Sequence, residues 1–168
     1  GRHVETLTGF KWLVRAGRPL RYAYEEAIGH CVLPEIMADK DGISAAAAWC
    51  AMVGSGGPTV AERLASVEAE FGAHLRRNSS LPLAAGADPA RTLERAAGRL
   101  GGTPLVGTAG IRVDVDGARA VIRPSGTEPL LKTYVEAWTA PHPTDADRDA
   151  AAGRLSALAE AVTRAVAG

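Results

Sequence analysis

A short polar segment inside an apolar stretch constrains this chain more than any other feature. Residues 123–129, RPSGTEP, follow apolar residues 120–122 and precede a largely apolar run that reaches Val135. Both flanks have the composition of β-strands, so the segment is predicted to be a loop joining two parts of a sheet. Pro124 fixes its own φ and favours an extended Arg123, which limits the freedom of this loop.

The side chains of the loop suit a phosphate group. Arg123 offers a planar fork of charged donors, and Ser125 and Thr127 offer hydroxyls. Gly126 lets the backbone approach a ligand closely. The alternative is a tight hairpin turn, because Pro, Ser and Gly are common turn residues. On their chemistry alone the residues leave both interpretations open, since short motifs match by chance.

The composition places any anion site locally. Lys and Arg together number 19, as do Asp and Glu, so no overall field attracts nucleic acid or an anionic membrane, and we expect neither partner. Hydrophobic residues make up 46% of the chain, which predicts a folded core. We find no stretch long and apolar enough to span a bilayer. Cys31 and Cys50 are predicted to be buried thiols, consistent with the cytoplasm.

The clearest helix signal covers residues 59–72, with a capping box at Thr59 and Glu62 and a stop at Gly72. An apolar stripe at helical spacing is predicted to be core: Val60, Leu64, Val67 and Phe71. The small polar stretch after it, residues 73–80, is predicted to be a linker. It divides the chain into domains at residues 1–73 and 74–168.

The second half predicts an α+β layer, a small antiparallel sheet with two helices on one side. Helix signals lie at residues 88–100, where Asp88 and Pro89 form a strong start, and from about Asp145. Three segments have strand patterns: residues 110–115, 118–122 and 130–138. Asp116-Gly117 between the first two is a strong hairpin signal.

The first half holds three candidate polar groups. Glu25 ends a strand-like segment and could accept hydrogen bonds from sugar hydroxyls, although a solvated loop is the simpler interpretation. Lys11 is either a surface lysine or a cation that reaches a ligand. Lys40 precedes an alanine-rich helix capped by Asp41 or Ser44, where the helix dipole favours an anion. A phosphate facing Lys40 would explain the cation, although loop lysines are common.

These stretches resemble one family. RPSGTEP followed by LLKTYVEA is similar to the phosphate-binding loop of the α-D-phosphohexomutases, which include phosphoglucomutase and phosphomannomutase. TLTGFKWL, YEEAIGH and DKDGISAA resemble, in order, the third domain of that family, most nearly its phosphoglucomutase and phosphopentomutase-like branch. The implied fold is the remainder of a mixed α/β sugar-binding domain. A fourth domain follows, with a small antiparallel sheet and helices on one side, like the TATA-box-binding protein.

The resemblance also implies site residues. The non-transferring phosphate of the substrate is expected at Arg123, Ser125, Gly126 and Thr127. The sugar is expected at Glu25, Ala27, Gly29 and His30, with Lys11 and Lys40 as nearby cations. Ala27 stands where the family usually has serine, which removes a hydrogen-bonding group and leaves glucose, mannose and pentose phosphates all open.

The reaction implied by the resemblance interconverts sugar 1-phosphates with 6-phosphates, or 5-phosphates for pentoses, through a phosphoserine enzyme and a bisphosphorylated intermediate. It requires an activated serine, Mg²⁺ and a sugar bisphosphate activator. The family's serine loop and aspartate-rich metal loop belong to its first two domains, and neither pattern occurs here. Asp145, Asp147 and Asp149 open a helix and are interpreted as dipole complements rather than metal ligands.

We therefore expect a C-terminal part of such an enzyme that binds no metal and is inactive alone. Its expected partners are a phosphorylated sugar and the N-terminal domains of the same chain. Gly1, rather than Met, opens the sequence, so a longer protein is expected. Residues 74–80 are a candidate hinge for domain closure. The alternatives are a non-catalytic phosphate-binding module and an interaction domain whose loop is only a turn.

Overall fold

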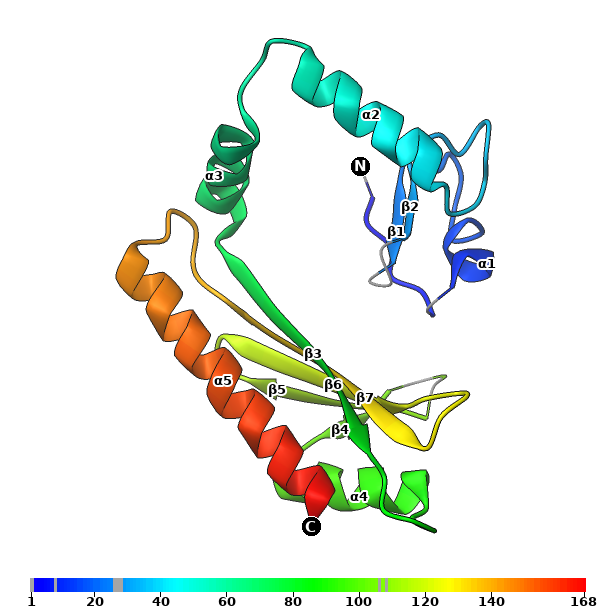
Figure 1. Cartoon of the computed structure of the whole chain (residues 1–168), viewed down its shortest axis with the longest axis vertical. Helices are drawn as coiled ribbons and strands as arrows, with labels where there is room; N and C mark the ends of the chain where they lie inside the picture. Colours follow the sequence, from blue (N-terminus) through cyan, green and yellow to red (C-terminus); the bar gives the residue numbers. More distant parts are fainter. Residues whose placement is uncertain (1, 8, 26–28, 106, 108) are drawn as a thin grey trace. The chain divides into compact units, whose positions relative to one another are not determined.

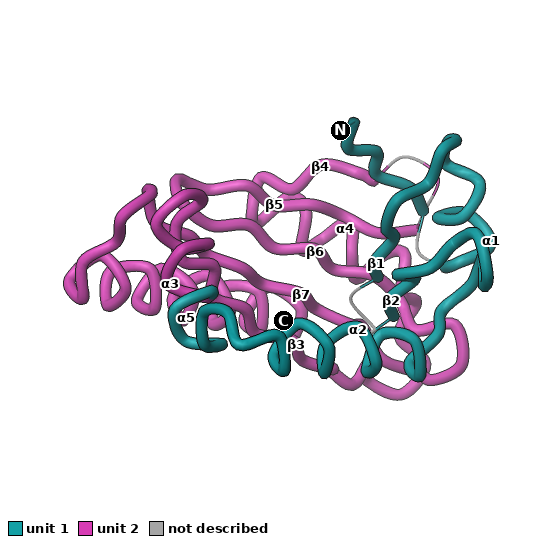
Figure 2. Tube along the Cα trace, turned by 90° about the horizontal axis from the view of Figure 1, so that it is seen from above, with its two compact units in different colours: residues 1–63 teal, residues 64–168 magenta. Residues whose placement is uncertain are grey.

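The computed structural model describes residues 2–7, 9–25, 29–105, 107 and 109–168. Figure 2 shows two compact units, residues 1–63 and 64–168. The boundary predicted between residues 73 and 74 falls inside the second unit. No helix of the described residues is long and apolar enough to cross a membrane.

The first unit contains a short hairpin and two helices. Its elements are α1 (Phe10–Leu13), β1 (Ala23–Glu25), β2 (Gly29–Cys31) and α2 (Gly42–Gly54). β1 and β2 pair antiparallel, with Tyr24 opposite His30 and Glu25 opposite Gly29. The core is small and consists of Phe10, Ala23 and Cys31. Cys31 is buried as predicted, whereas the same prediction for Cys50 is wrong because its side chain is exposed.

Helix α2 begins where the side chain of Asp41 accepts a hydrogen bond of 3.0 Å from the amide of Ile43. Asp41 is therefore the cap, as one of the two alternatives predicted. The helix buries none of its residues in this structure, and Ile43, Trp49 and Val53 are exposed.

The second unit is built on a five-stranded antiparallel sheet in the order β3-β7-β6-β5-β4. The strands are β3 (His74–Pro82), β4 (Thr103–Pro104), β5 (Ile111–Val115), β6 (Ala118–Pro124) and β7 (Leu130–Trp138). Helices α4 (Pro89–Leu100) and α5 (Asp145–Ala167) lie against one face of the sheet (Figure 1). The predicted fold class is confirmed.

The core lies between the sheet and these helices. Alternate residues of β6 and β7 point into it, so that Ile122 and Leu131 are completely buried. α5 contributes the predicted apolar face, made of Leu155, Leu158, Val162 and Val166. Burying each large apolar side chain contributes about 1.5–3 kcal/mol. The opposite face of the sheet carries the other alternate residues and is not covered by α4 or α5.

The prediction of a linker at residues 73–80 is wrong. These residues form most of β3, which pairs with β7 along its whole length, from His74 opposite Trp138 to Pro82 opposite Leu130. β3 is an edge strand and mostly exposed, so it lacks the alternation of apolar residues that marks a half-buried strand. A hinge at residues 74–80 has no flexible loop to act through.

Helix α3 (Val60–Phe71) has the predicted ends. Thr59 Oγ1 accepts from the amide of Glu62, Glu62 Oε2 accepts from the amide of Thr59, and Gly72 has φ +84°. The prediction that its apolar stripe is core is wrong here. Its four residues are about half exposed: Val60, Leu64, Val67 and Phe71. Helical spacing identifies an apolar face but not what covers that face.

Candidate functional site

Residues 125–129 connect β6 to β7, as predicted, and Arg123 and Pro124 are the last residues of β6. The connection is compact because the amide of Ser125 donates to the carbonyl of Leu130 at 2.9 Å. The amide of Leu130 donates in turn to the carbonyl of Glu128 at 2.8 Å. The loop therefore has a defined shape without any ligand.

Two cations flank the entrance to this loop. Arg123 lies directly opposite Lys132 in the β6–β7 register. Both belong to the set of alternate residues that point away from the core, so both lie on the uncovered face of the sheet. Like charges directly opposite each other destabilise a sheet. An anion bound between Arg123 and Lys132 would relieve that repulsion.

Tyr134 holds the guanidinium of Arg123. Nη2 of Arg123 donates to the hydroxyl of Tyr134 at 2.8 Å, and the guanidinium carbon lies 5.4 Å from the centre of the ring. Tyr134 lies two residues beyond Lys132 on the same face of β7. One guanidinium nitrogen is thus occupied, and the side chain is positioned before a ligand arrives.

The remaining loop residues are open to solvent. Gly126 and Thr127 are exposed and Ser125 is half-buried, with its hydroxyl 3.5 Å from the amide of Thr127. A Cβ added at Gly126 would meet no atom within 4 Å, and its φ lies outside the left-handed region. The fold therefore does not require glycine at this position. Close approach of an external ligand gives a reason for it.

In the first unit the structure brings Glu25 and Lys40 together. Nζ of Lys40 lies 3.1 Å from Oε1 of Glu25, and the side chain of Glu25 is only 10% exposed while that of Lys40 is 50% exposed. A carboxylate so nearly buried needs a charged partner. Lys40 provides it, which explains this loop lysine without a phosphate.

Gly29 allows Glu25 to take this place. A Cβ added to Gly29 would lie 2.6 Å from Cε2 of Phe10 and 2.7 Å from Cγ of Glu25, closer than atoms can pack. Gly29 is opposite Glu25 in the hairpin, so the carboxylate and the Phe10 ring share the space above it. The glycine thus positions Glu25.

His30 follows directly on β2. Its Nδ1 lies 2.7 Å from the hydroxyl of Tyr22, and the ring of Tyr24 is 5.0 Å away between centres. Ala27, the last predicted sugar contact, lies outside the described residues. Lys11 stands on the exposed side of α1 with Nζ 5.3 Å from the centre of the Trp12 ring. The described contacts do not link it to Glu25 or Lys40.

Sequence reasoning missed three residues that contact the predicted site residues: Lys132, Tyr134 and Tyr22. The first two could have been found by counting the register outward from the predicted loop, since a strand pair places Lys132 opposite Arg123. Tyr22 lies two residues before Tyr24, and residues two apart in an extended chain point to the same side. Its contact with His30 depends on the register of a hairpin that has only three residue pairs.

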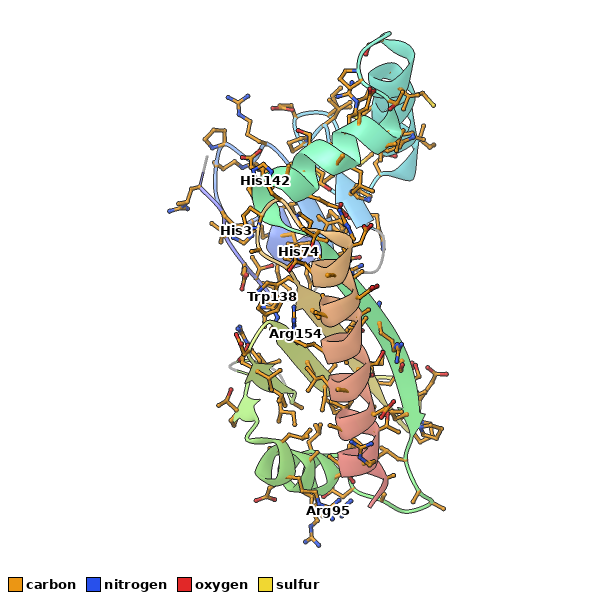
Figure 3. The ribbon with its side chains drawn as sticks, turned by 90° about the vertical axis from the view of Figure 1, so that its left-hand side faces the viewer. His3, His74, Arg95, Trp138, His142 and Arg154 are labelled. Carbon is orange, nitrogen blue, oxygen red and sulfur yellow. The ribbon has the colours of Figure 1, made fainter. Side chains whose placement is uncertain are left out.

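A pocket of about 470 Å³ lies at the other end of β6 and contains none of the predicted site residues. Arg154 of α5 lines it and donates from Nη2 to the carbonyl of Trp138 at 2.8 Å (Figure 3). Arg154 Nε is buried and has no partner among the described residues. A Cβ at Gly117 would lie 2.8 Å from that nitrogen, so Arg154 packs closely on this turn. We interpret the contact as structural.

Within the described residues, no group of three or more His, Cys, Asp or Glu side chains is arranged to hold a metal ion. Asp145 and Asp147 lie in the first turn of α5, as the interpretation of helix-dipole complements predicts. Asp147 also forms a capping box with Thr144. That interaction uses the carboxylate within the helix end.

Comparison with known proteins matches the first and second parts of the chain to two consecutive domains of one family. Residues 1–71 match the family model of phosphoglucomutase/phosphomannomutase alpha/beta/alpha domain III. Residues 60–152 match the model of the phosphoglucomutase/phosphomannomutase C-terminal domain. The chain belongs to the phosphoglucomutase/phosphomannomutase family. The two matches overlap on α3, and the boundary between the two compact units also lies within this helix.

Relatives within the phosphoglucomutase/phosphomannomutase family carry several names. A probable phosphomannomutase of Haemophilus influenzae is 32% identical over 166 residues, which cover 86% of this chain and 33% of the relative. The human phosphopentomutase is 35% identical over 85 residues, 45% of this chain and 14% of the relative. The chain thus spans a third or less of the length of these curated relatives.

A solved structure shares the fold of this family member. The open form of parafusin, a phosphoglucomutase from Paramecium, superposes with a TM-score of 0.60 at 17% sequence identity. The match covers 84% of this chain and 30% of that protein. At this identity the likeness concerns the fold alone.

Proposed function

We propose that this chain is the sugar- and phosphate-binding part of a phosphosugar mutase. The observation that carries the proposal is the pair of cations Arg123 and Lys132, placed directly opposite each other beside an exposed loop with an unexplained glycine. Opposed cations at such a loop suit an anion that accepts several hydrogen bonds, as a phosphate does. Membership of the family supports the choice of a phosphosugar as the ligand.

The loop would bind the phosphate that is not transferred. Arg123 would donate from the nitrogens that Tyr134 leaves available, and Lys132 would supply a second charge. The hydroxyls of Ser125 and Thr127 and the amide of Gly126 would complete the contacts. The sugar hydroxyls would bind at Glu25 and His30, with Gly29 and Ala27 in the same segment. Lys40 would hold the carboxylate of Glu25 in place through their ion pair, and Lys11 would be a further cation near the substrate.

The chemistry would come from elsewhere in a longer protein. The proposed reaction passes a phosphoryl group between an enzyme serine and either end of the sugar, through a bisphosphorylated intermediate. Mg²⁺ would offset charge on the transferring group. In this proposal the groups of this chain bind and orient the substrate. A sugar bisphosphate activator would use the same phosphate loop.

The proposed substrate is a class of sugar phosphates rather than one sugar phosphate. One relative is named a phosphomannomutase and another a phosphopentomutase, so their names do not agree on one sugar. Ala27 replaces the usual serine in the segment expected to contact the sugar. A pentose or a hexose phosphate is therefore proposed.

The test is an amide NMR titration of this chain with glucose 1-phosphate, with inorganic phosphate and glucose as controls. We expect shifts at Ser125–Thr127 with both phosphates, and shifts near Glu25 and Gly29 with the sugar phosphate only. Arg123→Ala should remove the shifts in the loop. Arg95→Ala, which removes an exposed arginine from α4 (Figure 3), should leave them unchanged. Loop shifts that survive Arg123→Ala would contradict the proposed phosphate site.

A coupled mutase assay tests whether this chain binds the substrate without converting it. We expect no turnover of glucose 1-phosphate by this chain alone, and measurable turnover would overturn that part of the proposal. Binding without turnover also fits a non-catalytic phosphosugar-binding module. If a longer chain that contains the serine and metal loops converts glucose 1-phosphate, the alternative of a non-catalytic binding module would be excluded.

A further inference from the structure

Tyr22 makes a polar contact whose role the proposed function leaves unexplained. Its hydroxyl lies 2.7 Å from Nδ1 of His30. Tyr24 stands opposite His30 in the hairpin, and its ring also lies against the imidazole, at 5.0 Å between centres compared with 6.1 Å for Tyr22. The imidazole therefore has two phenols beside it, and only Tyr22 forms a hydrogen bond with it.

The backbone of His30 is held independently of Tyr22. β2 pairs with β1 on one side, and the carbonyl of His30 accepts from the amide of Asp41 at 3.0 Å. These bonds leave open the orientation of the ring and the nitrogen that carries the proton. In a neutral histidine that choice is set by the hydrogen bond that the other nitrogen makes.

The direction of the hydrogen bond follows from the chemistry of the two groups. A phenol is a good donor and a weak acceptor, whereas an unprotonated imidazole nitrogen is a strong acceptor. Partial burial of the phenol, with a smaller contribution from Tyr24, raises the pKa of Tyr22 above its ordinary value. A phenol is protonated at neutral pH even at its ordinary pKa of about 10, so the hydroxyl can donate a hydrogen bond to Nδ1.

We propose that Tyr22 is a positioning residue that holds His30 in the tautomer protonated at Nε2, so that Nε2–H donates to an oxygen of the bound sugar phosphate. Among the described residues, the hydrogen bond of the His30 ring is made by Nδ1. The assignment of the tautomer stands on the protein alone. Its use on a sugar oxygen rests on the proposed function.

The test uses ¹⁵N-edited NMR of the neutral imidazole ring of His30 in the full chain. Tyr22→Phe removes the hydroxyl and keeps the ring. Tyr24→Phe is the matched control, because it removes a phenol oxygen from the other ring beside the same imidazole. In the wild type we expect a proton on Nε2 and a bare Nδ1. Tyr22→Phe should give a mixture of the two tautomers, and Tyr24→Phe should not.

Binding is the second measurement. Tyr22→Phe should weaken glucose 1-phosphate binding severalfold and leave the binding of inorganic phosphate unchanged, since the proposed contacts of the phosphate group do not include His30. A wild-type proton on Nδ1, or a tautomer that Tyr22→Phe leaves unchanged, would overturn the inference. The wild-type spectrum decides even if the variant fails to fold. The expected tautomers combined with equal glucose 1-phosphate binding would overturn the sugar contact, and would count against the proposed function rather than against Tyr22 as the tautomer control.

Discussion

Nη2 of Arg123 donates to the hydroxyl of Tyr134 across the β6–β7 pair, at 2.8 Å. The guanidinium also lies 5.4 Å from the ring centre, so the ring and the hydroxyl both stabilise one position of the cation. An arginine held in place before binding loses less side-chain entropy when it meets its ligand. Tyr134 therefore belongs to the proposed phosphate site although it need not contact the phosphate.

Tyr134→Phe keeps the ring but removes the hydrogen bond to Arg123, so it should weaken the binding of inorganic phosphate. A net hydrogen bond is worth about 0.5–1.5 kcal/mol, which corresponds to roughly a 2- to 12-fold rise in the dissociation constant. Tyr134→Leu should weaken binding further, since it removes the ring as well. Calorimetric titration with phosphate measures both. Equal affinity for the wild type and both variants would show that Tyr134 does not prepare Arg123.

Lys132 is predicted to act as the second phosphate cation. Lys132→Met removes its charge and should lower phosphate affinity by about tenfold, in the range of a hydrogen bond to a charged group. The same change should not destabilise the unbound protein, because it removes the repulsion between opposed cations. Thermal melts with and without phosphate measure the two effects together. A variant that is less stable when unbound, with unchanged affinity, would contradict this role.

Two glycines separate the needs of the fold from the needs of the ligand. Gly72 has φ +84°, and a Cβ there would lie 2.2 Å from the carbonyl oxygen of Thr139. Gly72→Ala should therefore destabilise the protein by at least the about 1–3 kcal/mol expected for a strained backbone. Gly126→Ala meets no protein atom and should leave the melting temperature unchanged while weakening phosphate binding. A large loss of stability in Gly126→Ala would refute the explanation given for this glycine.

Local signals predicted most of the second unit. The cap at Asp88 and the Asp116-Gly117 turn each act within a few residues, so their consequences can be read from the chain directly. β3 could not be predicted in this way. Its residues are mostly polar and exposed, and they form a strand because β7 offers an edge to pair with, far along the sequence.

The same difference between local and long-range signals applies to the candidate site. The polar residues of the loop stand together in the sequence, so Arg123 and its neighbours could be proposed from it. Glu25 and Lys40 were each proposed as well, but their ion pair was not, because it joins residues on either side of a hairpin. The apolar stripe of α3 shows the same limit, since its spacing predicted a buried face that the structure leaves exposed.

The start of α5 predicts a pH dependence of stability. Hydrogen bonds from the side chain and the amide of Thr144 lower the pKa of Asp147 below its ordinary value. The folded state therefore favours the ionised carboxylate, so its stabilising effect is present above the unfolded pKa and is lost as the pH falls through the folded pKa. Asp147→Asn should flatten this part of the acid dependence in thermal melts. Asp145→Asn changes the same helix charge without those bonds and should retain it.

The ion pair between Lys40 and Glu25 should affect ligand selectivity. Lys40 is half exposed, so solvent weakens its attraction to Glu25, whose side chain is only 10% exposed. Lys40→Met leaves a nearly buried carboxylate without its charged partner, which disturbs the group proposed to accept from sugar hydroxyls. We expect weaker glucose 1-phosphate binding with unchanged affinity for inorganic phosphate, because the phosphate loop is untouched.

Glu25→Gln should give the same pattern, since a neutral amide accepts more weakly than a carboxylate. Parallel NMR titrations with the two ligands separate these effects. If both variants weakened the two ligands equally, Glu25 would have no specific part in binding the sugar.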